Sequence, residues 1–390
     1  MAEKLTRPKT LNRKLPTHTP MRPRLVLYGW QLSYYTGKLL SYLRYKGIPF
    51  DEREVDLLTL VWRIKRETGE VVMPVLVTPE GEWLQDTSAI IDRLELQQPQ
   101  PAIAPAGPVQ RFASSLLEAW GDEWWVPIAM HTRWSYAENY AMFEREAGHS
   151  LMPRAPAWLQ RRVVARMANS LRGYLGAVGV RAEQLPLLDG WTRQMLDLLE
   201  AHFAQHPYLL GERPSLGDFG LAGPMVAHLG RDLWPARELI APRPQLRAWI
   251  ARMTEPAPPP PPTSPGTGWL ADDAIAPTLA PVLRLLLQSF VPLLAGINQQ
   301  VQALRPGWPA GQPLPRALGD VAVPLGDGVF RRAAIPYTLW MAQRPLDLFA
   351  ALPAGDQARV RRWLAALDGE GLLALDLPRL RRVGLRVALA

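Results

Sequence analysis

Five consecutive prolines, residues 258–262, divide the chain into two parts. A proline fixes its own φ and donates no backbone hydrogen bond, so such a run favours an extended polyproline II spacer over a packed helix or strand. The surrounding stretch, residues 254–268, is therefore predicted to link a larger N-terminal part to a C-terminal extension, residues 269–390. A chain of 390 residues, 48% of them apolar, is long enough for about two or three domains.

Cysteine content and charge exclude several classes of function. The chain has no cysteine, which excludes disulfide bonds, thiolate metal sites and a cysteine nucleophile. Its net charge is +8, but residues 1–24 carry seven Lys or Arg and one acid, which leaves a net charge of +2 for all the other residues. The positive charge thus lies mainly in a tail, residues 1–23, which is predicted to be disordered, and it does not indicate a nucleic-acid partner. The longest apolar run, residues 279–297, is interrupted by the charged side chain of Arg284, so we expect a packed helix there and no membrane span. We therefore expect a cytoplasmic protein.

Short apolar runs alternate with segments of helical periodicity in residues 24–98, in the order strand, helix, strand, helix, strand, strand, helix. Gly47 and Gly69 stand where two of the helices would end, and Asp86 stands where the last helix would begin. The predicted strands are 25–28, 50–55, 75–77 and 83–84, and the predicted helices are 34–46, 57–67 and 87–96.

The rest of the chain is predicted to be mostly helical. In residues 109–253 the expected helices are 109–147, 157–175, 187–205, 217–229 and 243–253. Ser215 and Asp218 form a capping box ahead of the fourth of these, so both residues are interpreted as structural. In the extension we expect helices at 277–303 and 356–368 and a hairpin at 321–330. Paired arginines in the extension, such as Arg331 and Arg332, are interpreted as solvent-facing.

The N-terminal part resembles the glutathione S-transferase superfamily in four short motifs. Residues 27–38 contain Ser33, residues 46–50 contain Gly47, residues 72–76 contain Pro74, and residues 86–90 begin with Asp86. In the helical part, residues 214–218 are similar to the family's capping motif. The resemblance covers residues 24–253. It implies an α/β thioredoxin-like domain at 24–98, then an all-α domain at 109–253, to which this chain adds its mostly helical extension.

The resemblance implies that the first domain binds glutathione and that Ser33 contacts the thiol. An ordinary thiol has a pKa of about 8.5, and lowering it by about two units takes about 2.7 kcal/mol. A hydrogen bond to a charged sulfur contributes about 1.5–3 kcal/mol and a helix N-terminus about 0.3–1 kcal/mol. Together they suffice without a proton-abstracting base. Tyr28, at the end of the first strand, is the alternative thiol contact, and Ser33 can also be interpreted as a simple helix cap.

The remaining glutathione contacts implied by the resemblance are Met73, Pro74, Asp86 and Thr87. The family's fold has a cis-proline at the position of Pro74, which presents the backbone of Met73 to the ligand in the manner of an added strand. Asp86 and Thr87 occupy the acid–hydroxyl motif for the γ-glutamyl end, where a helix N-terminus favours a carboxylate. The same pair is also an ordinary helix cap.

A second substrate, a small hydrophobic electrophile, would lie against the helical domain. Trp120, Trp124 and Trp125 fall on one predicted long helix and could form an aromatic wall, with core packing as the alternative. The resemblance thus implies a homodimeric transferase that joins the thiolate of glutathione to an electrophile. The residues themselves indicate no metal site, because His202 and His206, four residues apart, have no evident third ligand. The alternative is a non-catalytic binding or scaffold protein of the same fold, which the basic tail, the proline spacer and the extension favour. Nothing in the sequence assigns a role to residues 269–390.

Overall fold

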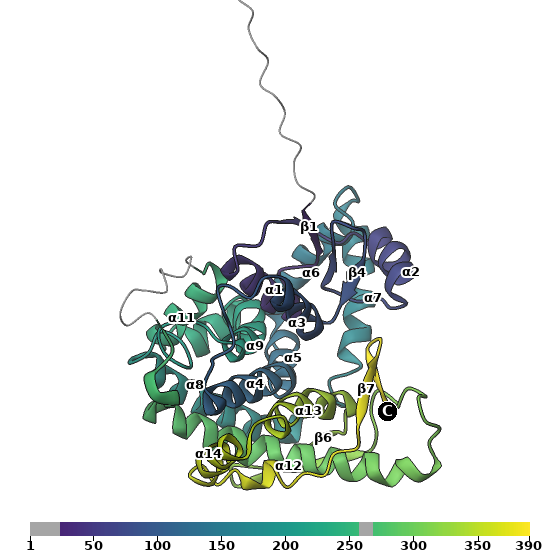
Figure 1. The fold of residues 1–390 in the computed structure, drawn as a ribbon. Coiled ribbons are helices and arrows are strands. Elements are labelled where there is room, and N and C mark those ends of the chain that lie inside the picture. Colours follow the sequence, from purple (N-terminus) through teal and green to yellow (C-terminus); the bar gives the residue numbers. More distant parts are fainter. Residues whose placement is uncertain (1–23, 257–267) are drawn as a thin grey trace, which may run out of the picture.

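The structure, a computed structural model, describes residues 24–256 and 268–390 (Figure 1). The predicted basic tail and the central part of the proline-rich stretch, residues 257–267, lie outside the described residues. Within them, a small four-stranded sheet with its helices is followed by a helical region, and the extension packs along that helical region (Figure 1).

The N-terminal domain has the thioredoxin-like arrangement and the predicted element order. Its elements are β1 (Leu25–Tyr28), α1 (Tyr34–Tyr45), β2 (Phe50–Arg53), a π-helical turn (Thr59–Ile64) leading into α2 (Lys65–Thr68), β3 (Val75–Val77), β4 (Trp83–Gln85) and α3 (Thr87–Gln97). The sheet order is β2-β1-β3-β4, with β1 parallel to β2 and the other pairs antiparallel. The antiparallel pairing of β3 with β4 places Val75 beside Gln85, so the start of β3 and the start of α3 lie on one side of the domain, where the site described below is found.

Local signals explain where these helices begin and end. Gly47 follows α1 with φ +62° and Gly69 follows α2 with φ +78°, a backbone conformation that glycine adopts without a Cβ clash. The carboxylate of Asp86 accepts a hydrogen bond of 2.8 Å from the backbone N–H of Ala89 and so caps α3. The three helix boundaries therefore fall where the sequence signals indicate.

The helical region contains more helices than the sequence predicts. It consists of α4 (Pro108–Glu123), α5 (Val126–Trp134), α6 (Ala137–Leu151), α7 (Ala157–Arg172), α8 (Leu185–Phe203), α9 (Leu216–Pro224), α10 (Leu233–Pro235) and α11 (Pro244–Thr254). The expectation of a single helix over 109–147 is wrong, because α4, α5 and α6 are separate. Pro127 has no N–H to donate to the carbonyl of Glu123, four residues earlier, and Tyr136 adopts an extended conformation between α5 and α6.

Asp218 anchors the start of α9. Its carboxylate accepts hydrogen bonds from the backbone N–H of Ser215 at 2.8 Å and of Leu209 at 3.0 Å, and from the indole N–H of Trp249 at 3.0 Å. Ser215 and Asp218 form the reciprocal capping box of this helix, and both are fully buried. Burial raises the pKa of Asp218, while the hydrogen bonds from Ser215, Leu209 and Trp249 oppose this shift. The pair thus ties α9 to its neighbours inside the helical core.

The extension is helical with two hairpins. Its elements are α12 (Ala280–Leu304), β5 (Asp320–Leu325), β6 (Gly328–Ala333), α13 (Pro336–Ala350), α14 (Ala354–Ala365), β7 (Leu380–Val383) and β8 (Arg386–Leu389). The predicted helices and the hairpin are present, whereas α13 and the β7–β8 hairpin were not predicted. Helices α13 and α14 pack against α4, and α12 packs against α8 (Figure 1). One cluster of buried apolar residues runs through all three parts of the chain.

Asp273, near the start of the extension, caps α4. Its two carboxylate oxygens accept hydrogen bonds from the backbone N–H groups of Val109 at 3.0 Å and Gln110 at 2.9 Å. Arg359 from α14 contacts the same carboxylate at 2.9 Å. At Gly107, a Cβ atom would lie 2.0 Å from Asp273 Oδ1, so glycine leaves the room that this cap needs. The first turn of α4 therefore depends on a residue of the extension.

One segment of the described chain, Ala271–Gly307, is long and apolar enough to cross a membrane by length and composition alone. In this structure the apolar residues of α12, such as Leu283, Phe290 and Leu294, are fully buried in the protein core. Packing within the protein thus accounts for these buried apolar residues of the helix.

Candidate functional site

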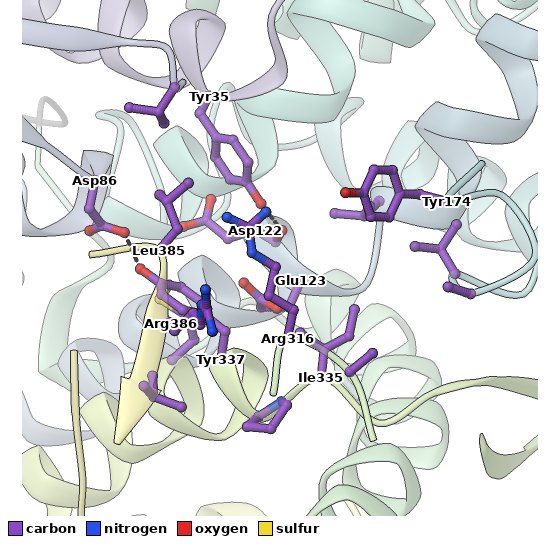
Figure 2. Close-up of a pocket in the computed structure, with 18 of the residues that line it drawn as sticks. Tyr35, Asp86, Asp122, Glu123, Tyr174, Arg316, Ile335, Tyr337, Leu385 and Arg386 are labelled. Carbon is purple, nitrogen blue, oxygen red and sulfur yellow. Dashed lines mark hydrogen bonds between the residues drawn. The ribbon is translucent and has the colours of Figure 1, made fainter. Parts of the chain in front are cut away.

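A cavity of about 500 Å³ lies where the thioredoxin-like domain, the helical region and the extension meet (Figure 2). The thioredoxin-like domain lines it with Tyr35 and with residues at the starts of β3 and α3. The helical region contributes the end of α4 and the segment after α7. The extension contributes the end of β6, the start of α13 and the start of β8. Three parts of the chain that are distant in sequence thus build one site.

Four predicted glutathione contacts lie together in this cavity. Met73, Pro74, Asp86 and Thr87 all line it, and the Met73–Pro74 peptide bond is cis, as the resemblance implies. Thr87 is buried at the first position of α3. Asp86 has φ +76°, which directs the chain from β4 into α3 and places its carboxylate over the helix N-terminus.

The carboxylate of Asp86 already has two partners in the protein. One oxygen accepts the hydrogen bond from Ala89 N–H, and the other accepts a hydrogen bond from the hydroxyl of Tyr337 (Figure 2). Tyr337 belongs to α13 of the extension, and burial and the nearby Asp86 carboxylate raise the pKa of its hydroxyl. The hydroxyl therefore stays protonated and can donate at any physiological pH. An ammonium group that binds Asp86 must share or displace this contact.

The two predicted thiol contacts are not among the residues that line the cavity. Ser33 is half-buried at the N-cap of α1, where its side chain makes no capping hydrogen bond within the described structure. Tyr28 is buried, and its ring stacks on Trp83 with the centroids 5.4 Å apart. Its hydroxyl accepts long contacts of 3.4 Å from Arg63 and 3.5 Å from Arg53. Met73, Pro74, Asp86 and Thr87 thus line one cavity, whereas the side chains of Ser33 and Tyr28 do not, although Tyr28 pairs with Val75 next to Pro74 in the sheet.

Tyr35, two residues after Ser33, is the hydroxyl of α1 that does line the cavity (Figure 2). It donates a hydrogen bond of 3.2 Å to the backbone carbonyl of Asp122. Burial and the nearby carboxylates of Glu123 and Asp122 raise its pKa well above the usual value, so it remains a neutral donor. Sequence reasoning passed over Tyr35. Its place in the same motif as Ser33, in the first turn of α1, is the signal that could have identified it.

Two buried acids form the wall at the end of α4. Asp122 Oδ2 contacts Lys38 Nζ at 2.6 Å, while its second oxygen is buried and has no partner within the described residues. Lys38 also contacts Glu118 at 2.8 Å, so two carboxylates share one buried ammonium. Burial, only partly offset by Lys38, raises the pKa of Asp122 to about 7. For Glu118 burial also opposes ionisation, but Lys38 and Arg344 outweigh it and lower the pKa to about 2.

Glu123, the second acid of the wall, is bound by the extension. Its Oε2 accepts a hydrogen bond of 2.6 Å from the hydroxyl of Thr338 on α13. Burial raises the pKa of Glu123, and Thr338 and the nearby Arg332 oppose this shift. Neither acid was singled out from the sequence, because the end of a helix next to aromatic residues carries no motif.

Arg332, on β6, is a buried cation at the cavity. Its side chain is 1% exposed, which corrects the expectation that it faces solvent. It donates a hydrogen bond of 3.2 Å to the backbone carbonyl of Glu123, and its Nε has no partner within the described residues. Alternation along β6 explains the burial, because Phe330 and Arg332 face the core while Val329 and Arg331 are exposed.

The three tryptophans predicted to line a second-substrate pocket belong to the core instead. Trp120, Trp124 and Trp125 are at most 1% exposed, and none of them lines the cavity. Each packs against Trp191 of α8, with ring centroids 6.4, 5.3 and 5.5 Å from it. The three side chains thus lie together in the core around Trp191 rather than along one open helix face. Smaller apolar residues, such as Val126 and Ile335, line the cavity in their place.

The described residues contain no group of three His, Asp or Glu side chains placed to hold a metal ion. The cavity therefore offers hydroxyls, carboxylates, guanidinium groups and the backbone at Met73 as its chemical groups. These groups suit binding of a polar ligand with ionic ends and an apolar body.

Comparison with known proteins gives two family matches. Residues 27–102 match the glutathione S-transferase N-terminal domain, and residues 192–252 match the glutathione S-transferase C-terminal domain. No curated protein matches the chain. The two domain matches fall on the thioredoxin-like domain and on the helical region, in that order.

Several solved structures are similar at low identity. A glutathione S-transferase from Methylobacterium radiotolerans, in complex with glutathione sulfonate, is 21% identical, with a TM-score of 0.38 over 65% of this chain and 98% of that chain. A glutathione S-transferase from Rhodospirillum rubrum is 17% identical, with a TM-score of 0.37 over 66% of this chain and 99% of that chain. The β-etherase LigF from a Sphingobium strain is 18% identical, with a TM-score of 0.38 over 59% of this chain and 94% of that chain.

Proposed function

The chain is a member of the glutathione S-transferase superfamily that carries an additional C-terminal segment, and from this premise we propose that it binds glutathione in the cavity described above. One observation supports the proposal. The backbone at Met73 and Pro74 and the N-terminus of α3 at Asp86 and Thr87 converge on the same cavity. The backbone at Met73 can pair with a peptide backbone. The N-terminus of α3 can hold the carboxylate of a γ-glutamyl group, and the carboxylate of Asp86 can hold its ammonium.

In the proposed reaction the enzyme lowers the pKa of the glutathione thiol and presents the thiolate to a small hydrophobic electrophile. The sulfur forms a bond to an electrophilic carbon while the leaving group departs with its electron pair, and the thiol proton passes to solvent. Ser33, at the N-cap of α1, is the proposed donor to the thiolate, and Tyr28 is the alternative. Tyr35 adds a third hydroxyl, and it already lines the cavity.

Calorimetry with glutathione tests the binding step. We expect binding at micromolar to millimolar concentrations and a clear loss of affinity in Thr87→Val, which removes the hydroxyl at the helix N-terminus. Thr59→Val is the matched control, because Thr59 lies outside the cavity. Absence of heat at millimolar glutathione, or equal affinity in both variants, would refute the proposed site.

The second candidate function is that of a binding or scaffold protein that keeps the fold without transferase activity. The contact between Tyr337 and Asp86 favours it, because a residue of the extension already occupies the carboxylate proposed to bind the ligand ammonium. Activity assays with glutathione and an aryl halide separate the two functions. Glutathione binding without conjugation would favour the scaffold function, and conjugation would exclude it.

We further propose a homodimer in the cytoplasm as the working form of this protein. Light scattering coupled to size-exclusion chromatography measures the mass directly, and a mass near 43.6 kDa would indicate a monomer instead.

A further inference from the structure

Arg332 differs from every other buried cation of the described chain. Five Lys or Arg residues of that part are buried, and four of them have a carboxylate close by. The nitrogen–oxygen distances are 2.6 Å for Lys38 and Asp122, 2.6 Å for Lys46 and Glu95, 2.8 Å for Arg133 and Asp232, and 2.6 Å for Arg243 and Asp197. Within the described residues, Arg332 alone among the five has no carboxylate within 4 Å.

Neither Glu123 nor Asp122 forms an ion pair with Arg332. Glu123 accepts a hydrogen bond from the guanidinium through its backbone carbonyl. Its carboxylate accepts from Thr338 and acts on Arg332 electrostatically, without an ion pair within 4 Å. Asp122 is bound to Lys38. Taking an unpaired charge out of water is unfavourable, and a buried guanidinium with an unpartnered Nε leaves a strong hydrogen-bond donor unused. An anion of matching shape would satisfy both the charge and the donor.

The cavity around Arg332 is suited to a ligand with an apolar body. Val126, Val178, Ile335 and Met341 line it, and its volume of about 500 Å³ is that of a site for a small organic molecule. Arg316 and Arg386 are exposed residues of the extension that also line the cavity (Figure 2). Their positive charge favours the approach of an anion from solvent.

We propose that the C-terminal extension makes this cavity a binding site for a small apolar carboxylate, whose anionic group is held by the buried guanidinium of Arg332. A carboxylate is favoured because its planar pair of oxygens fits the planar fork of arginine. The site combines a cation from β6 with apolar residues from α13 and the helical region, so it does not exist without the extension. Glutathione is not required for it.

Titration calorimetry in glutathione-free buffer tests this site with a matched pair of probes, naphthalene carboxylate and its neutral amide. The wild-type protein should bind the carboxylate about 10- to 100-fold more tightly than the amide, because a hydrogen bond to a charged group is added. In Arg332→Met this preference should disappear. Arg331→Met is the control, because Arg331 is the next residue of the same strand and is exposed on its other face. Equal affinity for the two probes in the wild type, or a preference that survives in Arg332→Met, would overturn the proposal.

Two further measurements keep the test decisive. The midpoint of thermal unfolding of ligand-free Arg332→Met should stay close to that of the wild type, because the change removes a buried charge that has no ion pair together with its hydrogen bond to the carbonyl of Glu123. If Arg332→Met does not fold, the comparison of the two probes on wild-type protein and on Arg332→Gln decides instead. Titration of glutathione into the wild type and into Arg332→Met is the last measurement. If glutathione loses affinity in Arg332→Met and competes with naphthalene carboxylate, the guanidinium serves a carboxylate of glutathione and the proposed site is refuted.

Discussion

The hydroxyl of Tyr337 donates a hydrogen bond to the carboxylate of Asp86, across 251 residues of sequence. Asp86 caps the helix at which the γ-glutamyl group is proposed to bind, and Tyr337 stands at the start of α13 in the extension. Through this contact a residue of the extension becomes part of the site that the thioredoxin-like domain forms.

Tyr337→Phe should strengthen glutathione binding. The change frees one oxygen of Asp86 for the ligand ammonium, and a single hydrogen bond contributes about 0.5–1.5 kcal/mol, so we expect an affinity about 2- to 10-fold higher. Calorimetry measures this directly. Tyr174→Phe serves as control, because Tyr174 lines the same cavity and is half exposed, at 52%. A weaker affinity in Tyr337→Phe would mean that its hydroxyl contacts the ligand.

Ser33→Ala should lose most conjugation activity near neutral pH and keep glutathione binding. Without the hydroxyl the thiol pKa returns toward about 8.5, so the rate at pH 6.5 should fall about 10- to 100-fold and the loss should shrink by pH 9. Rates with an aryl halide at several pH values measure this. Ser170→Ala, on the exposed surface of α7, is the control. An unchanged pH–rate profile would move the assignment to Tyr28 or Tyr35, which Tyr28→Phe and Tyr35→Phe then distinguish.

Trp124→Ala should destabilise the protein rather than alter one ligand site. The indole is 1% exposed and packs against Trp191, and truncation of a buried aromatic side chain costs about 3–5 kcal/mol of unfolding free energy. Denaturant titration followed by circular dichroism measures the difference. Trp158→Ala removes a side chain that is 67% exposed and should change the unfolding free energy by less than about 0.5 kcal/mol. Similar values for the two variants would contradict the core assignment.

The unfolding free energy of Asp122→Asn should increase relative to that of the wild type as the pH rises. Burial raises the pKa of Asp122 to about 7 in the folded protein, above its ordinary value of 3.8. Between these values the folded state binds more protons than the unfolded state, so the contribution of Asp122 to the unfolding free energy falls as pH increases through 7.

The difference in unfolding free energy between Asp122→Asn and the wild type should therefore grow by about 1–3 kcal/mol from pH 5 to pH 8. The groups that act on Asp122 are Lys38, Glu118 and Glu123, and all three stay in place in this variant. Urea titrations at both pH values give the comparison, and a difference independent of pH would show that Asp122 is ionised throughout this range.

Most of the thioredoxin-like domain could be predicted because its signals are local. Gly47 and Gly69 end helices through their own backbone conformation, and Asp86 caps α3 through its own side chain. The break of the predicted long helix was missed although Pro127 was visible, because the apolar spacing on both sides of it stays helical. Helix α13 was missed for a related reason, since Pro336 and Pro345 obscure its periodicity.

The site was only half predictable. Met73, Pro74, Asp86 and Thr87 were found because a family resemblance fixes them in sequence, and they lie together. Arg332 and Tyr337 come from the extension, outside the residues that carry the family resemblance, and their positions at the cavity depend on packing between distant parts of the chain. Of the two residues, Arg332 was the easier to predict from the sequence, because alternation with Phe330 places it on the inner face of its strand.

The cap that Asp273 places on α4 also bears on the order of events during synthesis. Helix α4 ends in Asp122 and Glu123, and its first turn is bound by a residue more than 160 positions later in the chain. A nascent chain that has completed both family domains still lacks this cap and the α13 and α14 helices that cover α4. Folding of the helical region on the ribosome should therefore remain incomplete until the extension has emerged, and protease resistance of stalled nascent chains should appear only at lengths that include it.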